Sequence, residues 1–161
     1  MINLIRCDDR LIHGQCMTRL VQHFKIKHII VVDDFTANDP TMRAIIKMLA
    51  MPGMENEAVS VKDAIEPIKK AIDDNVGTMI VFRFPLIAKT LFDQIDNLPK
   101  SLMIGPVQKQ SELAVTAQPG TYLEQNEIEA LDQLDQRGIE VHFQVVPDMK
   151  RISFKEFKSK L

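Results

Sequence analysis

Short apolar runs alternate with segments of helical periodicity along most of the chain. The apolar runs cover residues 2–5, 27–33, 57–61, 78–84, 101–104 and 140–146. Most are rich in β-branched residues, which is typical of strands buried on both faces of a sheet. Residues 108–120 show no clean period, and we predict a loop there, with at most a small strand near residues 113–116.

The segments between these runs carry helix signals. After the first run, Met17, Leu20 and Val21 recur on one face of a helix that should begin near Gly14. Further helices are predicted after residues 38–40, after residue 60, from residue 85, over 126–137 and over 153–160. Pro67 interrupts the pattern that follows residue 60, so that helix should be kinked or start late. Residues 33–35 are predicted to be a loop.

Strands separated by single helices favour βαβ units. We therefore predict one α/β domain over residues 1–161, with a mostly parallel sheet and helices on both faces. Ligands bind such sheets beyond the carboxyl ends of the strands. Residues 8–13 follow the first predicted strand, and Asp33, Asp34 and Arg83 stand at the corresponding ends of two others. These side chains should converge at one edge.

Composition narrows the class of protein. A formal net charge of −2 argues against general nucleic-acid binding, which normally shows as a basic excess. The chain has no run of about 18 or more apolar residues, and charged residues from Asp8 onward interrupt any signal peptide. Two cysteines fit a reducing cytoplasm. Dinucleotide, Walker and zinc motifs are absent, so no cofactor and no metal are expected.

The loop at residues 7–15, CDDRLIHGQ, holds the candidate chemistry. His13 stands where the helix should begin, and its unprotonated ring could act as nucleophile or base. The free amides of Gly14 and Gln15 could hydrogen-bond an anion on that ring. Arg10 could fork onto phosphate oxygens and stabilise their charge during transfer.

The two aspartates allow several arrangements. Asp8 or Asp9 could orient the imidazole, or pair with Arg10 or Arg6 and hold the loop. Taken alone, the same residue types also fit a solvent-facing histidine among local ion pairs. Arg83, at a strand end on the same side as His13, is a candidate for the surroundings of the site, as are Asp8 and Asp34.

The motif DDRLIHGQ closely resembles the active-site loop of IIB components of the bacterial sugar phosphotransferase system (PTS), in the mannose–fructose–sorbose class. The resemblance extends over essentially all of the chain, through VVDD at 31–34, AND-P at 37–40, the strand and turn at 82–85 and VVPD at 145–148. The family often has tryptophan near the position of Leu20 and valine at that of Cys16. These departures lie outside the phosphate loop and bear on permease docking or sugar class.

The resemblance implies a phosphohistidine–sugar phosphotransferase. His13 would accept a phosphoryl group from phospho-IIA and pass it to a sugar in the membrane-embedded IIC/IID permease. Arg10 would stabilise the phosphate, Asp9 would order the loop or orient the imidazole, and Gly14 and Gln15 would belong to the anion site. The protein would be cytoplasmic and associate peripherally with the permease. IIA is expected as a separate polypeptide, because the chain starts directly on its first strand.

Two other classes stay open at this point. One is a regulatory or interaction module that keeps the fold without phosphotransfer, and the other is a small-molecule enzyme that uses His13 as general base. The sequence also leaves open a homo-oligomer, the identity of the sugar and the ring nitrogen that would carry the phosphate.

Overall fold

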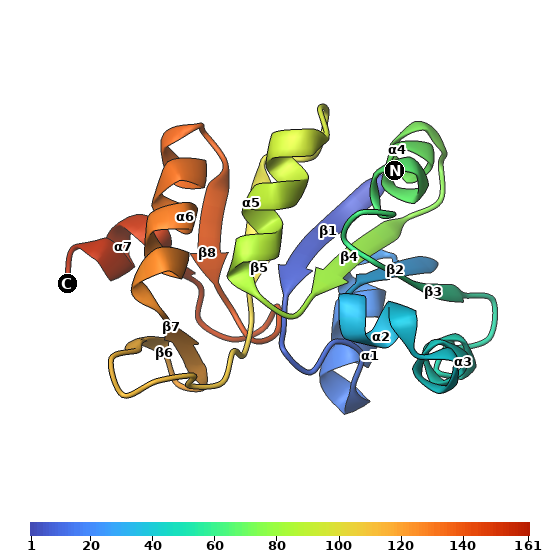
Figure 1. Cartoon of the computed structure of the whole chain (residues 1–161), viewed down its shortest axis with the longest axis horizontal. Coiled ribbons are helices and arrows are strands. Elements are labelled where there is room, and N and C mark those ends of the chain that lie inside the picture. Colours follow the sequence, from blue (N-terminus) through green and yellow to red (C-terminus); the bar gives the residue numbers. More distant parts are fainter.

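A seven-stranded sheet forms the centre of the molecule, in a computed structural model that describes all 161 residues (Figure 1). The strand order is β3-β2-β4-β1-β5-β8-β9, and every pairing is parallel except that of β8 with β9. The strands are β1 (Ile2–Cys7), β2 (His28–Val32), β3 (Glu55–Val59), β4 (Thr78–Phe82), β5 (Ser101–Ile104), β8 (Glu140–Phe143) and β9 (Ile152–Ser153). The predicted α/β architecture with a mostly parallel sheet is confirmed.

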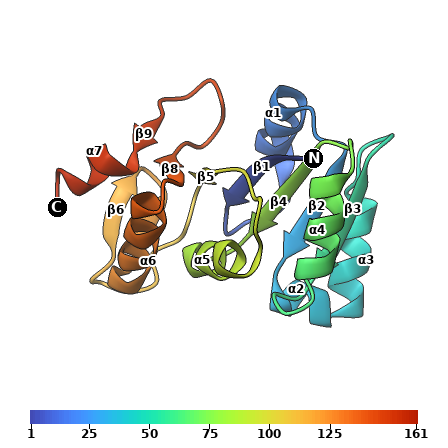
Figure 2. The ribbon, with the colours of Figure 1, turned by 90° about the horizontal axis from the view of Figure 1, so that it is seen from above.

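Helices cover both faces of this sheet. They are α1 (Gly14–Phe24), α2 (Asp34–Asn38), α3 (Pro40–Met48), α4 (Ile65–Asp73), α5 (Pro85–Gln94), α6 (Gln125–Gln136) and α7 (Phe154–Lys158). Figure 2 shows α1 on one side of the strands and α5 and α6 on the other. No helix is both long and apolar enough to cross a bilayer.

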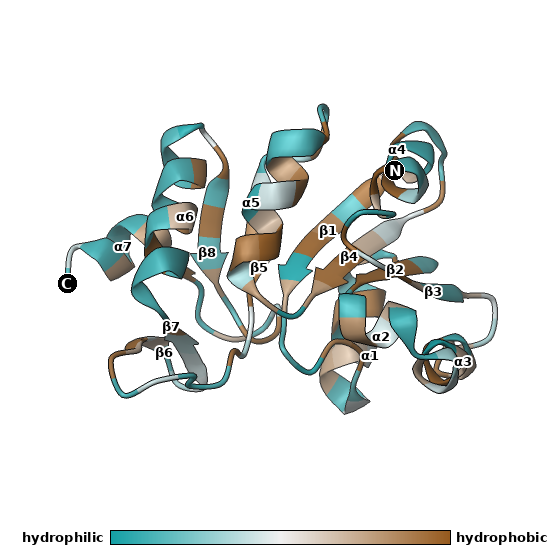
Figure 3. Ribbon diagram, in the orientation of Figure 1, coloured by the Kyte–Doolittle hydropathy of each residue, from teal (hydrophilic) through white to brown (hydrophobic).

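Alternating side chains of the buried strands fill two hydrophobic cores, one on each face of the sheet. On β1, Ile5 belongs to the larger core under α4 to α7, and Leu4 belongs to the smaller one under α1 and α3. The helices are correspondingly two-sided, with hydrophilic residues outward (Figure 3). Burial on both faces explains why the strands appear in the sequence as continuous apolar runs.

Three short elements were not predicted from the sequence: α2, β7 (Thr121–Leu123) and β9. Residues 33–35 are not a loop, because Asp33 caps α2 by accepting a hydrogen bond from the Thr36 amide at 3.0 Å. The small strand placed near residues 113–116 is β6 (Val115–Gln118), and it pairs with an unpredicted strand, β7 (Thr121–Leu123), in a separate hairpin. β9, also unpredicted, has only two residues, too few for a periodic pattern.

Several predicted boundaries shift by a few residues. β3 begins earlier than residue 57, while β4 and β8 end before residues 84 and 146. The helix after Ser60 starts late, at Ile65, which places Pro67 in its first turn, where no intrahelical donor is needed. On α3, Ile46 is buried, whereas Ile45 and Leu49 are exposed.

The parallel strands all end on one edge of the sheet, the lower edge in Figure 1. The start of α1 and the hairpin of β6 and β7 lie at this same edge. β1 occupies the middle of the sheet between β4 and β5. The loop after β1 is therefore surrounded by the ends of its neighbours.

Candidate functional site

The loop between β1 and α1 is held by one backbone hydrogen bond to a neighbouring segment and one within the loop. The Asp9 amide donates to the Pro106 carbonyl at 3.0 Å, and the Leu11 amide donates to the Asp8 carbonyl at 2.9 Å. Leu11 has a left-handed backbone, with φ of 57°, but its side chain is buried in the smaller core. Burial of this leucine offsets a backbone conformation that costs about 1–2 kcal/mol and fixes the loop.

His13 is the N-cap residue of α1 and has an extended backbone, with φ of −155°. Its Nε2 lies 3.1 Å from Oδ2 of Asp8, and 20% of its side chain is exposed. Because an ionised carboxylate can only accept a hydrogen bond, this contact favours the tautomer with hydrogen on Nε2 and a lone pair on Nδ1. The structure thus orients the ring and leaves Nδ1 free of an intramolecular hydrogen bond.

Asp8 is the carboxylate around which the site is arranged, and its side chain is fully buried. Its Oδ2 accepts from Arg6 Nη2 at 3.1 Å, and its Oδ1 accepts from the Arg10 amide at 3.0 Å and from Arg10 Nε at 3.2 Å. Burial opposes ionisation of Asp8. The charge of Arg6 and the hydrogen bonds from Arg10 and His13 outweigh it, and the pKa of Asp8 is lowered. Asp8 is therefore anionic at neutral pH.

Arg10 lies beside the same carboxylate but at the surface, with 40% of its side chain exposed. Burial opposes its charge, but the hydrogen bond and charge of Asp8 outweigh it and raise the pKa of Arg10 above its usual value. Its guanidinium is thus held in place on one side and remains open to solvent on the other. That arrangement suits contact with an incoming anion.

Asp9 has a different neighbour from Asp8. Its Oδ2 accepts a hydrogen bond from the Gln108 amide at 2.6 Å, and its Oδ1 is buried without a partner. The carboxylate of Asp9 therefore joins the loop after β1 to the segment after β5. Of the two aspartates considered for orienting the imidazole, the one that contacts the ring is Asp8.

Arg83 braces the loop from β4. Its Nε and Nη2 donate to the two carboxylate oxygens of Asp33 at 3.1 and 3.2 Å, and its Nη1 donates to the Asp9 carbonyl at 3.0 Å. Asp34 turns away and accepts from the Val61 amide at 2.8 Å. The convergence at the strand ends thus includes Arg83 and Asp33, while Asp34 holds the segment after β3.

The first turn of α1 offers free amides. No side chain caps this helix and no acidic residue stands in its first turn. Gly14, with φ of 36°, and Gln15 follow directly after His13, and an added Cβ at Gly14 would meet no atom within 4 Å. Unpartnered amides and the positive end of the helix dipole favour an anion at this position.

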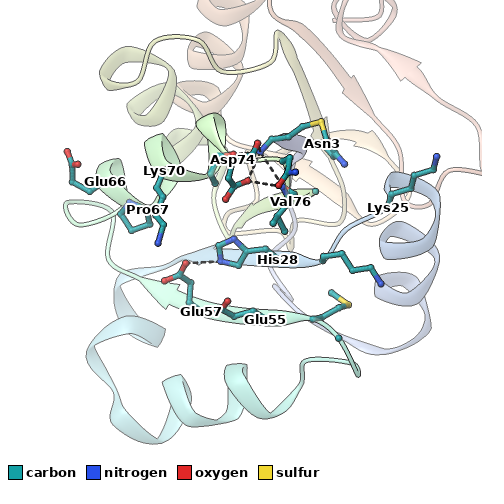
Figure 4. Close-up of a pocket in the computed structure, with 17 residues that line it drawn as sticks. Asn3, Lys25, His28, Glu55, Glu57, Glu66, Pro67, Lys70, Asp74 and Val76 are labelled. Carbon is teal, nitrogen blue, oxygen red and sulfur yellow. Dashed lines mark hydrogen bonds and ion pairs between the residues drawn. The ribbon is translucent and has the colours of Figure 1, made fainter.

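The largest hollow in the molecule, about 1120 Å³, lies at the opposite edge of the sheet, among the amino ends of β2, β3 and β4 (Figure 4). Two pairs of its charged groups contact each other: His28 Nε2 lies 2.8 Å from Glu57, and the amino terminus lies 2.9 Å from Asp74. It holds no residue of the loop at 7–15. His13 instead stands on an open surface, since none of the larger hollows includes it.

The whole chain matches a known family. A family model described as "PTS system sorbose subfamily IIB component" matches residues 2–160. The chain belongs to this family. As a IIB protein it is a component of a sugar phosphotransferase system, and the predicted membership of the mannose–fructose–sorbose class is confirmed.

Relatives and solved structures agree with this assignment. The mannose-specific EIIAB component of Escherichia coli (strain K12) is 27% identical over 161 residues, covering 100% of this chain and 49% of the relative. The chain thus spans about half the length of that protein. The sorbose-specific EIIB component of Klebsiella pneumoniae is 30% identical over 150 residues, covering 90% of this chain and 87% of the relative. The crystal structure of the IIBSor domain of the Klebsiella pneumoniae sorbose permease has a TM-score of 0.89 and 25% identity, covering 99% of this chain and 98% of that one.

Two contacts of this IIB site were not predicted: Asp33 to Arg83, and the Gln108 amide to Asp9. The pairing of Arg6 with Asp8 was one of the arrangements that the sequence left open, and it had a signal, because residues two apart on a strand point to the same face. Arg6 was a charged residue inside an apolar run, two positions before Asp8. The contact of Gln108 had none, since it depends on how the segment after β5 folds back.

Proposed function

We propose that this IIB protein is a phosphocarrier that takes a phosphoryl group from phospho-IIA on His13. It then passes the group to a sugar held by the IIC/IID permease. The observation that carries the proposal is the contact of His13 Nε2 with the buried, anionic Asp8, beside an open helix N-terminus. It leaves Nδ1 of a partly exposed imidazole without a hydrogen-bond partner, and it places an anion beside the ring that gains positive charge.

The ring nitrogen that accepts the group is Nδ1. Its lone pair attacks phosphorus of the donor phosphohistidine in line, the new N–P bond forms as the old one breaks, and the donor nitrogen keeps the electron pair. Phosphorylation at Nδ1 with hydrogen retained on Nε2 makes the imidazole cationic, and Asp8 stabilises this cation at 3.1 Å. In the second transfer a sugar hydroxyl oxygen attacks the phosphorus, the N–P bond of His13 breaks with its electron pair kept on Nδ1, and the hydroxyl proton passes to solvent.

Arg10 and the first turn of α1 stabilise the phosphoryl group during its transfer. The transferring phosphoryl carries its charge on three equatorial oxygens, and fixed donors aimed at these oxygens lower the barrier. The exposed side of Arg10 and the amides of Gly14 and Gln15 are the donors in this position. Asp9 and Arg83 hold the loop that carries them.

The open surface at His13 favours protein partners over a free small substrate. An enzyme that uses His13 as general base on a soluble metabolite would normally enclose it in a cleft. A phosphocarrier must present the same histidine to two large partners in turn, and a loop on a rigid scaffold suits that task. We propose a cytoplasmic site of action with peripheral docking on the permease.

Phosphoryl transfer to His13 can be tested with labelled phospho-IIA. His13→Gln should fold normally but accept no acid-labile label, because glutamine has no nucleophilic ring nitrogen. His23→Gln, on the exposed face of α1, is the matched control and should be labelled as the wild type is. Retained labelling of the His13 variant would refute the assignment.

A further inference from the structure

Arg6 is a fully buried arginine directly behind the site. It lies on β1, inside an apolar run, and its guanidinium makes four contacts in different directions, one of them from Nη1 to Sδ of Met103 at 2.7 Å. Nη2 donates to Asp8 Oδ2 at 3.1 Å and to the Val145 carbonyl at 2.8 Å, and Nη1 donates to the Gln144 carbonyl at 3.1 Å. A buried guanidinium is costly to desolvate. A local ion pair alone therefore does not explain why an arginine occupies this position.

The head group of Arg6 lies close to the backbone at Gly105. A Cβ built at Gly105 would lie 2.3 Å from Nη2 and 2.7 Å from Cζ of Arg6. Only glycine therefore leaves room for the guanidinium at this point. The Gly105 amide also donates to the Cys7 carbonyl at 2.7 Å, which holds the segment after β5 against the end of β1.

The contacts of Asp8 show that Arg6 fixes the orientation of its carboxylate. Oδ2 of Asp8 accepts from Arg6 on its buried side, while His13 Nε2 lies 3.1 Å away on the side facing solvent. Arg10 donates to the same carboxylate from the surface. With Arg6 fixed by the carbonyls of residues 144 and 145, the carboxylate cannot rotate away from the ring.

We propose that Arg6 is a positioning residue for phosphoryl transfer, and that it holds Asp8 in the orientation that keeps hydrogen on Nε2 of His13. This inference rests on the proposed phosphocarrier function. Arg6 touches neither the phosphoryl group nor His13, and it acts through the buried carboxylate alone. Gly105 contributes to the same positioning, because it makes room for the guanidinium of Arg6.

The charge of Arg6 acts on Asp8 in addition to its position. Arg6 neutralises part of the charge that Asp8 presents to the ring. The cations beside Asp8 are thus Arg6 on its buried side and Arg10 at the surface.

Two variants of the full chain separate positioning from simple packing. Arg6→Lys keeps a cation but loses the planar fork that reaches Asp8 and two carbonyls together. Gly105→Ala keeps the arginine and displaces its head group. Gly77→Ala is the matched control, because its Cβ would lie 2.2 Å from the Lys25 carbonyl oxygen, at the opposite edge of the sheet. Circular dichroism and thermal melts check that each variant folds.

Two measurements test whether Arg6 positions Asp8 for phosphoryl transfer. The ¹⁵N shifts of the His13 ring, measured by NMR on the unphosphorylated protein, report which nitrogen carries hydrogen. Initial rates of labelling are measured with phospho-IIA and with phosphoramidate, a small donor that needs no docking. We expect both site variants to lose part of the Nε2–H population and to be labelled about tenfold more slowly, with the control close to wild type.

The inference is overturned if the folded Arg6 and Gly105 variants keep the wild-type ring shifts. It is also overturned if Gly77→Ala slows labelling to the same extent, since general destabilisation would then explain the effect. Failure of the wild type to accept any label would instead refute the phosphocarrier function. The ring shifts of the unphosphorylated protein would still decide the role of Arg6 in that case.

Discussion

Nε2 of His13 lies 3.1 Å from Oδ2 of Asp8, a carboxylate that has no solvent exposure. The two residues are five positions apart, at the end of β1 and the start of α1, and the buried member is held by Arg6 from behind. A histidine with 20% of its side chain exposed thus obtains a fixed tautomer from an acid that solvent does not reach.

Asp8→Asn should slow phosphorylation of His13 by about 100-fold or more, because an amide can hold the ring in the wrong tautomer. It also leaves Arg6 as a buried charge without its anion, which costs roughly 3–5 kcal/mol in the free energy of unfolding. Labelling by phospho-IIA and urea unfolding measure the two effects. An Asp8→Asn protein labelled at the wild-type rate would show that Asp8 serves folding only.

Arg10→Lys should lower the transfer rate about tenfold while changing the free energy of unfolding by less than about 1 kcal/mol. The lysine ammonium can approach phosphate as a point charge but cannot make two parallel hydrogen bonds. Single-turnover labelling compared with thermal melts separates the two quantities. Arg43→Lys, exposed on α3, is the control and should behave as wild type. Equal rates for the two variants would restrict Arg10 to ordering the loop.

Gly14→Ala should cost about 1 kcal/mol of stability, because its φ of 36° lies in a region that L residues rarely adopt. Its added methyl meets no protein atom but stands beside the amides that receive the phosphoryl group, so transfer should slow as well. Gly53→Ala, with φ of 80° and similar free space, should lose comparable stability and keep its transfer rate. Unchanged transfer in both variants would place the anion elsewhere.

The Asp33–Arg83 pair should make the protein sensitive to acid. Burial opposes ionisation of Asp33, but hydrogen bonds from Arg83 and Thr36 outweigh it and hold the pKa of Asp33 below its usual value. The folded state therefore binds fewer protons than the unfolded state, and stability rises with pH through this range.

The contribution of Asp33 is complete above its unfolded pKa of about 3.9 and is lost as pH falls through the lower folded pKa. Urea unfolding between neutral pH and the acid range should show this loss. Asp33→Asn should be less stable at neutral pH and lose less on acidification. An equally steep acid loss in that variant would assign the sensitivity to other groups such as Asp8.

Much of the architecture could be predicted from the sequence. Continuous apolar runs such as Ile30 to Val32 arise from burial on both faces, and the alternation with helical patterns implies a parallel sheet. Caps at Asp39 and Pro40 and the late start of α4 near Pro67 also depend on local chemistry. These features depend mainly on neighbours within a few positions, which a sequence displays directly.

The short elements could be identified only from the tertiary structure. α2 forms because Asp33 caps it, while the same carboxylate is held by Arg83, which directly follows β4. β9 has two residues and exists only because it pairs with β8. Such elements have too few residues for a pattern of their own, so long-range contacts decide them.

The sequence by itself determined that Asp8, Arg10, His13 and Gly14 share one loop at the end of a buried strand, because strand, loop and helix follow one another along the chain. Only the tertiary structure decided which aspartate touches the imidazole. Asp8 continues the face of β1 that carries Arg6, and Asp9 points to the Gln108 amide instead. The roles of two adjacent carboxylates were divided by the direction of each side chain at the strand end and by partners some hundred residues away.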